Sequence, residues 1–161
     1  MRARASDRER VFERAEHFEV GAHGEALAID HLEHLGYRIV AANFSLPIGR
    51  NTREVIVNAE IDVVAYDGPT LCFVEVKTRA TDDVALPQTN VDLRKRRQIT
   101  RAARSYRRLM GLTSAPFRYD VVTVVAKPDD ANPRIELLKN FWTDEQLRKK
   151  NWQDRYWDYR S

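Results

Sequence analysis

The feature that most constrains the fold is the segment from Thr70 to Arg79, TLCFVEVKTR, which is the most strongly β-prone stretch of the chain. Because side chains alternate across a strand, Glu75 and Lys77 lie on the same face as the apolar Phe73. A carboxylate and an ammonium in such surroundings are costly to bury unless they are paired or bound to a ligand. We therefore expect a central strand that carries a charged pair. Taken alone, a Glu/Lys pair is also explained by a partly exposed strand end.

Composition limits the remaining choices. The 161 residues, 43% hydrophobic and 32% charged, suffice for one globular domain and argue against wholesale disorder. The single cysteine, Cys72, cannot form an internal disulfide, and no Cys/His cluster is present for zinc or an iron–sulfur centre. The first apolar run is too short for a signal peptide or a membrane span. These features predict a cytoplasmic protein with no membrane partner, in which Cys72 is a small core residue.

The hydrophobic pattern predicts an α/β fold with the order α-β-β-β-α-β and a short final strand. Helices are expected at 24–35 and 91–110, with Leu35 and Leu109 on their buried sides, and strands at 37–44, 54–65, 70–78, 117–126 and 134–138. Pro47, Gly49 and Asn51 indicate a loop between the first two strands. Asp120 is interpreted as a charge at the end of a strand. Together these elements predict a mixed central sheet flanked by helices.

The domain is expected to cover residues 21–138, between a charged N-terminal extension at 1–20, expected to form a frayed or marginal helix, and an aromatic-rich C-terminal extension at 139–161. In the latter, Thr143 and Gln146 have the spacing of a capping box at the start of a short helix. Its later aromatic residues could stack on bases, although packing against the domain or a second copy of the chain is favoured. These aromatic residues are Trp152, Tyr156, Trp157 and Tyr159.

A second acid is expected beside Glu75. On the strand at 54–65, alternation places Asp62 on one face together with Glu60, Val64 and Tyr66. The turn at Asp67-Gly68-Pro69 returns the chain antiparallel to itself, which brings Asp62 near Glu75. Glu25 is in line with the apolar stripe of the first helix and is expected to face the sheet there, although a charge in a first helical turn is also favoured by the helix dipole.

Clustered carboxylates are the hard oxygen ligands that Mg²⁺ and Mn²⁺ prefer. Such an ion can activate water and neutralise charge that develops on a phosphodiester, while Lys77 could orient or deprotonate the water or stabilise the pentavalent phosphorus centre. No Ser/His/Asp or Cys/His arrangement suggests acyl transfer, and no G-x-x-x-x-G-K-[ST] loop suggests an NTPase. The residue types therefore favour metal-dependent phosphodiester hydrolysis.

Several motifs carry a family resemblance. They are GAHGEA at 21–26, EIDVVA at 60–65, FVEVKTR at 73–79, Lys95, and FRYDVV at 117–122. Over roughly residues 21–137 the chain resembles the YraN-like family of bacterial proteins. That family looks like a branch of the restriction-endonuclease-like superfamily, whose nucleases carry the PD-(D/E)-x-K signature and include archaeal Holliday junction resolvases. The resemblance implies a restriction-endonuclease-like core.

The resemblance also implies roles for individual residues. Asp62 and Glu75 would be metal ligands, Lys77 the catalytic lysine, and Glu25 the helix acid that completes the site. The chain departs from the family in having Ala59 where a glycine usually precedes the Glu-Ile-Asp triplet, and in a longer segment at 46–58. Both differences change the hairpin that presents Asp62.

A DNA-binding surface is expected on the second helix. Arginine makes up 21 of the 27 basic residues, which leans toward phosphate recognition, although GC-rich coding has the same effect. Residues 91–110 contain eight basic residues and one acid, Asp92. Helical spacing places Arg97, Arg101, Arg104 and Arg108 in one stripe. The stripe is also explained by a solvated helix face that binds no partner. The predicted nucleic-acid contacts are Arg79, Arg94, Lys95, Arg97, Arg101, Arg104 and Arg108.

These observations favour a DNA endonuclease dependent on Mg²⁺ or Mn²⁺, acting on branched or otherwise irregular DNA. An alternative is a nucleic-acid-binding module that keeps the fold without cleaving. A third is a dimeric interaction protein in which the carboxylates are structural. The combination of Asp62, Glu75 and Lys77 favours the enzyme, because a protein without catalysis has no need of all three.

Overall fold

The computed structural model describes residues 7–79, 91–126 and 131–148, with side chains from residue 21 onward. The aromatic group at Trp152, Tyr156, Trp157 and Tyr159 lies outside these residues.

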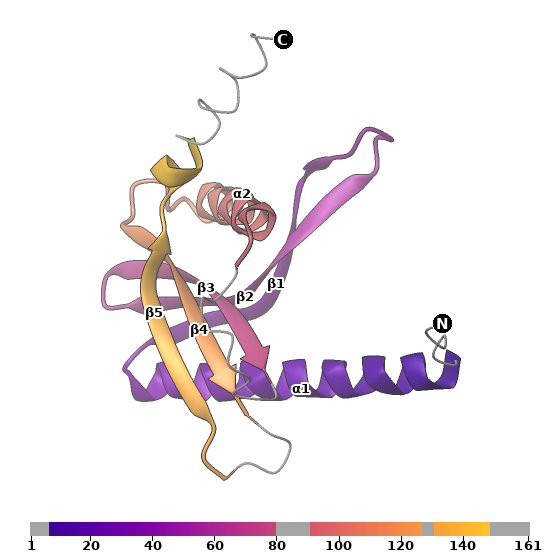
Figure 1. Ribbon diagram of the computed structural model, residues 1–161. Coiled ribbons are helices and arrows are strands. Elements are labelled where there is room, and N and C mark those ends of the chain that lie inside the picture. The colour runs from indigo at the N-terminus through magenta and orange to yellow at the C-terminus, as the bar shows by residue number, and fades with distance from the viewer. Residues whose placement is uncertain (1–6, 80–90, 127–130, 149–161) are drawn as a thin grey trace, which may run out of the picture.

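The chain folds into one sheet with a long helix on either side (Figure 1). The strand order is β1-β2-β3-β4-β5, and β3 and β4 are the parallel neighbours, joined through α2. The other neighbouring strands are antiparallel, so the predicted mixed sheet flanked by helices is confirmed. In chain order the elements are α1 (Asp7–His34), β1 (Arg38–Arg50), β2 (Ile56–Asp67), β3 (Thr70–Arg79), α2 (Leu93–Leu109), β4 (Phe117–Val125) and β5 (Arg134–Trp142).

Each helix buries one face of the sheet. On the α1 side, Ala28 and Leu32 pack against a layer that includes Val74 and the buried Cys72. On the α2 side, Ile99, Ala102, Ala103 and Tyr106 pack against the other layer, where Phe73 contacts Tyr106 edge to face at 5.7 Å. β3 contributes to both layers, which confirms that it is a central strand and that Cys72 is a core residue.

The β1–β2 hairpin is longer than predicted. The expected loop at Pro47 and Gly49 belongs to β1, which continues to Arg50. Pro47 is tolerated because β1 is an edge strand, and a register shift between Pro47 and Gly49 accommodates it. Asn51 closes the turn by accepting hydrogen bonds from the backbone N–H groups of Arg53 and Val55 at 2.9 and 3.0 Å. The hairpin rises alongside α2 in Figure 1.

The helices differ from the predictions at their ends. α1 begins at Asp7, so most of the charged N-terminal stretch and the predicted first helix form one continuous helix. Leu35 and Leu109 are exposed, because each lies at or beyond the end of its helix, where the chain turns away from the sheet. The capping box before the short C-terminal helix is confirmed: the Thr143 N–H donates to Gln146 Oε1 at 3.1 Å, and the Gln146 N–H donates to Thr143 Oγ1 at 3.3 Å.

The interpretation of Asp120 as a strand-end charge is wrong. Its side chain is fully buried, and Arg118 Nε donates to Asp120 Oδ1 at 2.9 Å. The Asn140 N–H donates to the same oxygen at 2.9 Å, and Arg118 also bonds Asp67 at 2.6 Å. The acid is therefore a paired internal charge that ties β4 to β5 and to the β2–β3 turn, an arrangement that only the tertiary contacts create.

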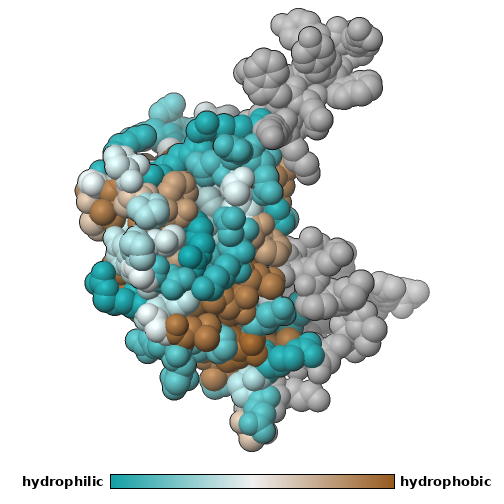
Figure 2. All heavy atoms as spheres, turned by 90° about the vertical axis from the view of Figure 1, so that its left-hand side faces the viewer, coloured by the Kyte–Doolittle hydropathy of each residue, from teal (hydrophilic) through white to brown (hydrophobic). Residues whose placement is uncertain are grey.

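The face of the molecule on which β5 lies is largely polar. In Figure 2 this face is mainly hydrophilic, with an apolar area in its lower half. In the part of the chain that the structure describes, no helix has both the length and the apolar character needed to cross a membrane.

A close approach of α1 to β3 depends on Gly24. A Cβ atom at this position would overlap the hydroxyl and methyl groups of Thr78. Gly24 is buried and directly precedes Glu25, so this contact sets the position of Glu25 relative to the sheet. Gly21, one turn earlier in α1, has no atom within 4 Å of its equivalent Cβ position.

The two glycines give a matched test of this contact. Gly24→Ala should lower the free energy of unfolding by about 1 to 3 kcal/mol, because the added methyl group forces α1 away from β3. Gly21→Ala should raise it by about 0.5 to 1 kcal/mol, because alanine is the better helix former and the space is open. Urea denaturation followed by circular dichroism measures both. A stabilising Gly24→Ala would contradict the close approach.

Candidate active site

The site lies where β2 and β3 separate. Their backbone ladder runs from the turn to the pair Val63–Val74. In the next step of this register Asp62 would face Glu75, but no backbone pairing continues there. Instead, the Val76 N–H donates to Asp62 Oδ2 at 2.8 Å. A side-chain carboxylate thus replaces a main-chain acceptor, and the sheet stays open beside Glu75.

β2 rolls about its axis at Asp62. Ile61 packs in the layer on the α2 side, whereas Val63 packs in the layer on the α1 side. Residues two apart in a regular strand share one face. In the neighbouring strand β1, Asn43 occupies the position opposite Asp62 and has a left-handed backbone, with φ of 49°. Both strands therefore change orientation at the same level, and Asp62 points along the sheet toward β3.

The roll corrects one sequence prediction. Glu60 was expected to share a face with Asp62, Val64 and Tyr66 through simple alternation. Because β2 changes orientation at Asp62, Glu60 does not share the face of Val64 and Tyr66. Its side chain is exposed to solvent. The expectation that Asp62 lies near Glu75 agrees with the structure, in which the two carboxylates interact directly.

Glu75 is a buried acid held between two lysines. Its exposed fraction is 2%, and it lies on the α2 side of the sheet. Lys77 Nζ is 3.0 Å from Oε1, and Lys95 Nζ, from the first turn of α2, is 3.5 Å from Oε2. Oε2 is buried yet accepts no hydrogen bond. A further ligand at Oε2 would have to displace Lys95, its charged neighbour.

Lys95 reaches Glu75 because of how α2 begins. Asp92 is the N-cap of the helix, and its carboxylate accepts the Lys95 N–H at 2.8 Å. This capping fixes the first turn of α2 beside β3. Lys95, predicted only as a nucleic-acid contact, therefore belongs to the site itself, and the single acid of the basic segment has a structural role.

Glu25 approaches the site from α1. Burial raises the pKa of its carboxyl group, a hydrogen bond with the Asn43 side chain opposes this, and the charges of Asp62 and Glu60 raise it further. Its charge therefore interacts with that of Asp62. Among the described residues, however, no three Asp, Glu, His or Cys side chains lie close enough together to form a metal-binding group. The structure thus brings Asp62 and Glu75 together and leaves Glu25 as their neighbour.

The position of Asp62 is electrostatically unfavourable for its charged form. Burial is the largest effect, followed by the neighbouring Glu75 charge, and together they raise the pKa of Asp62 to about 6. The Val76 N–H and the charge of Lys95 partly oppose this rise. A divalent cation would relieve the same repulsion. The hard oxygen donors, the unbonded Glu75 oxygen and the raised pKa of Asp62 all fit an Mg²⁺ or Mn²⁺ ion.

The predicted basic stripe on α2 is partly anchored within the molecule. Arg101 donates to the Ile48 carbonyl oxygen at 2.6 Å, which ties α2 to the β1–β2 hairpin. Arg104 bonds Asp144 at 3.0 Å. Arg94 and Arg108 are exposed, Arg97 is half-buried, and Arg79 lies exposed at the end of β3. The stripe is therefore a surface of fixed and exposed cations rather than a uniformly solvated face.

Sequence reasoning missed Asn43 and the Glu75 contact of Lys95. An asparagine inside an apolar strand pattern was an available signal for Asn43, because asparagine adopts left-handed backbone more readily than most residues. No local pattern indicates that Lys95 reaches Glu75, since the contact depends on the placement of α2 against β3.

Comparison with known proteins identifies the family and several relatives of this chain. The sequence model of the "Uncharacterised protein family UPF0102" matches residues 24–124, a range that contains Glu25, Asp62, Glu75, Lys77 and Lys95. A UPF0102 protein of Koribacter versatilis is 40% identical over 125 residues, which cover 78% of this chain and 80% of the relative. A UPF0102 protein of Geobacter sulfurreducens is 41% identical over 121 residues, covering 75% of this chain and 86% of the relative.

The strained position of Asp62 predicts a stabilising substitution. In EDTA at pH 7.5, Asp62→Asn should raise the free energy of unfolding by about 1 to 3 kcal/mol, because about 1.4 kcal/mol accompanies each unit of pKa shift. The amide oxygen still accepts the Val76 N–H. Since the folded-state pKa is about 6 and the ordinary value is 3.8, the gain should shrink as the pH falls from 6 to 4. Thermal denaturation across this pH range measures it, and a destabilised variant at pH 7.5 would contradict the raised pKa.

Proposed function

The chain belongs to the protein family UPF0102, which confirms the resemblance to the YraN-like proteins, and on this basis we propose that it is a divalent-metal-dependent DNA endonuclease. One observation carries the proposal: two interacting carboxylates, the half-buried Asp62 and the buried Glu75, lie at an opening in the sheet with two lysines beside them. Such acids are costly unless they are paired or bound to a ligand, and a pair of acids with a perturbed pKa is typical of functional sites.

Asp62 and Glu75 would hold the Mg²⁺ or Mn²⁺ ion, with Glu25 supporting them from α1. When bound, such an ion supplies positive charge to a phosphodiester and lowers the pKa of a water molecule. Asp62 is oriented by the Val76 N–H, which fixes one of its oxygens against β3. Glu75 presents Oε2, the oxygen that accepts no hydrogen bond.

Lys77 would act on the reacting phosphate. Its side chain is 36% exposed, so the ammonium group connects buried Glu75 with solvent and with an incoming substrate. There it can orient the attacking water or stabilise negative charge on the pentavalent phosphorus centre. Lys95 contacts the other Glu75 oxygen, Oε2, at 3.5 Å and adds a second positive charge beside the acid.

DNA is the proposed partner, bound along α2. The helix begins at the site through Lys95 and carries Arg94, Arg97, Arg101, Arg104 and Arg108 away from it. The bonds from Arg101 to Ile48 and from Arg104 to Asp144 place these two guanidinium groups in defined positions, and exposed pairs of this kind exchange readily for phosphate. Branched or otherwise irregular DNA is the proposed form of this substrate.

Metal binding gives the first test. Isothermal calorimetry with Mn²⁺ should show one site in the wild-type protein, weakened at least tenfold by Glu75→Gln or Asp62→Asn because each removes a charged ligand. Glu60→Gln is the matched control, since this acid lies two residues from Asp62 but is exposed outside the pair. Equal affinities in all four proteins would remove the proposed metal site.

Cleavage tests the function itself. With Mg²⁺ or Mn²⁺, the wild-type protein should cut at least one DNA in a panel of single strands, duplexes, flaps and four-way junctions. Lys77→Met should lower kcat by about 10² to 10⁴ while the affinity for DNA stays within a few fold, because the assigned role lies in the transition state.

Lys139→Met is the control for the lysine substitution, because Lys139 bonds Asp67 at 2.9 Å, away from Glu75. It should cleave like the wild-type protein. Tight DNA binding without cleavage of any substrate would overturn the enzyme assignment and favour the non-catalytic binding module.

A further inference from the structure

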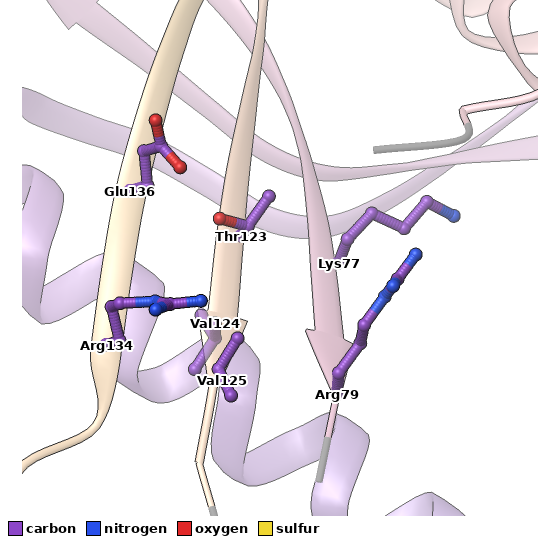
Figure 3. Close-up of a pocket in the computed structure, with 7 residues that line it drawn as sticks. All are labelled: Lys77, Arg79, Thr123, Val124, Val125, Arg134 and Glu136. Atoms are coloured by element: carbon purple, nitrogen blue, oxygen red, sulfur yellow. The ribbon is translucent and has the colours of Figure 1, made fainter. Parts of the chain in front are cut away.

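A groove on the α2 side of the sheet lies directly beside the candidate active site. It crosses β3, β4 and β5 in the part of the sheet where side chains become partly or fully exposed (Figure 3). Two rows of cross-strand neighbours line it. The first row consists of Lys77, Thr123 and Glu136, and the second of Arg79, Val125 and Arg134.

The strand register connects this groove to Glu75. Glu75 pairs with Val121, and Val121 pairs with Leu138, forming a buried row beneath α2. Side chains two positions apart in a strand share one face. The two rows of the groove therefore lie on the same face of the sheet as the row of Glu75, next to it. Successive rows are ~7 Å apart, which places the second groove row about 13 Å from Glu75. Because phosphates along one DNA strand rise ~3.4 Å per nucleotide, several neighbours of a phosphate at Glu75 fall within this distance.

The chemistry of the groove suits a polyanion. Lys77, Arg79 and Arg134 contribute three cations against the single acid Glu136, and Thr123 adds a hydroxyl group. In Figure 3 the Lys77 and Arg79 side chains extend from β3 on the side away from β4, while the Arg134 side chain crosses from β5 toward β4. Guanidinium groups match pairs of phosphate oxygens. Val125, the half-buried apolar residue between Arg79 and Arg134, lowers the local polarity and strengthens such contacts.

Building on the proposed nuclease function, we propose that this groove is a phosphate-binding subsite for the DNA strand whose phosphodiester reacts at Glu75 and Lys77. Arg79 and Arg134 bind backbone phosphates on one side of the scissile bond. The Thr123 hydroxyl donates a hydrogen bond to one of these phosphates. Glu136 opposes the phosphate charge and limits the affinity. The subsite extends the predicted role of Arg79 to residues of β4 and β5.

Salt dependence of DNA binding tests the subsite. In a Lys77→Met background without divalent ions, fluorescence anisotropy with a labelled duplex gives Kd between 50 and 200 mM NaCl. Loss of two phosphate contacts lowers the log–log slope by about 1.8. The parent protein should therefore lose about 12-fold more affinity over this range than the Arg79→Gln/Arg134→Gln variant. Glu136→Gln should bind more tightly than its parent.

A control variant that removes two positive charges elsewhere distinguishes the loss of groove contacts from the change in net charge. Arg38→Gln/Arg53→Gln removes two exposed arginines of β1 and of the β1–β2 turn, outside the groove. It should keep the parental slope. An equal reduction of the slope in both double variants, or an unchanged slope in Arg79→Gln/Arg134→Gln, would overturn the subsite.

Cleavage kinetics separate failure of the subsite from failure of the nuclease. In the presence of Lys77, Arg79→Gln/Arg134→Gln should raise KM about tenfold with kcat unchanged, because the lost contacts are equal in the ground and transition states. If the wild-type protein cleaves and KM is unaffected, the subsite is wrong and the nuclease stands. If the wild-type protein cleaves nothing while the slope still falls by about 1.8, the nuclease assignment fails and the phosphate subsite stands.

Discussion

The hydrogen bond from the Val76 N–H to Asp62 is the interaction on which the site depends. It ends the β2–β3 ladder without leaving the β3 donor unpaired, since a side-chain oxygen takes the place of a main-chain carbonyl. The sheet can therefore open at Glu75 and remain intact on either side of the opening. The left-handed backbone of Asn43 lets β1 follow β2 through the same change of orientation.

The electrostatics of the opening explain why several elements converge on it. Two interacting carboxylates in a buried position repel each other and lose hydration. Lys77 and Lys95 lower this cost, and the Asp92 cap of α2 holds Lys95 in place. Gly24 allows α1 to approach β3 so that Glu25 comes near the pair. The arrangement holds two acids together at a local cost in stability, and a bound cation would offset this cost.

Local patterns in the sequence are sufficient for the fold class and for the pairing of Asp62 with Glu75, because alternation in β3 and the short turn before it are local properties. They are insufficient for the roll at Asp62, since simple alternation assigns Glu60 and Asp62 to one face. The contact of Lys95 with Glu75 and the burial of Asp120 against Arg118 depend on how distant elements pack. The β1–β2 hairpin was underestimated because Pro47 and Gly49 are loop formers that an edge strand can accommodate.

The central claim is that the opening between β2 and β3 is a cation site of a nuclease. Anomalous diffraction from crystals grown with Mn²⁺ tests it most directly, because the signal locates the ion without reference to activity. The account predicts a peak between the carboxylates of Asp62 and Glu75, with Lys95 displaced from Glu75 Oε2. Crystals saturated with Mn²⁺ in which this position is empty and both lysines remain on Glu75 would contradict it.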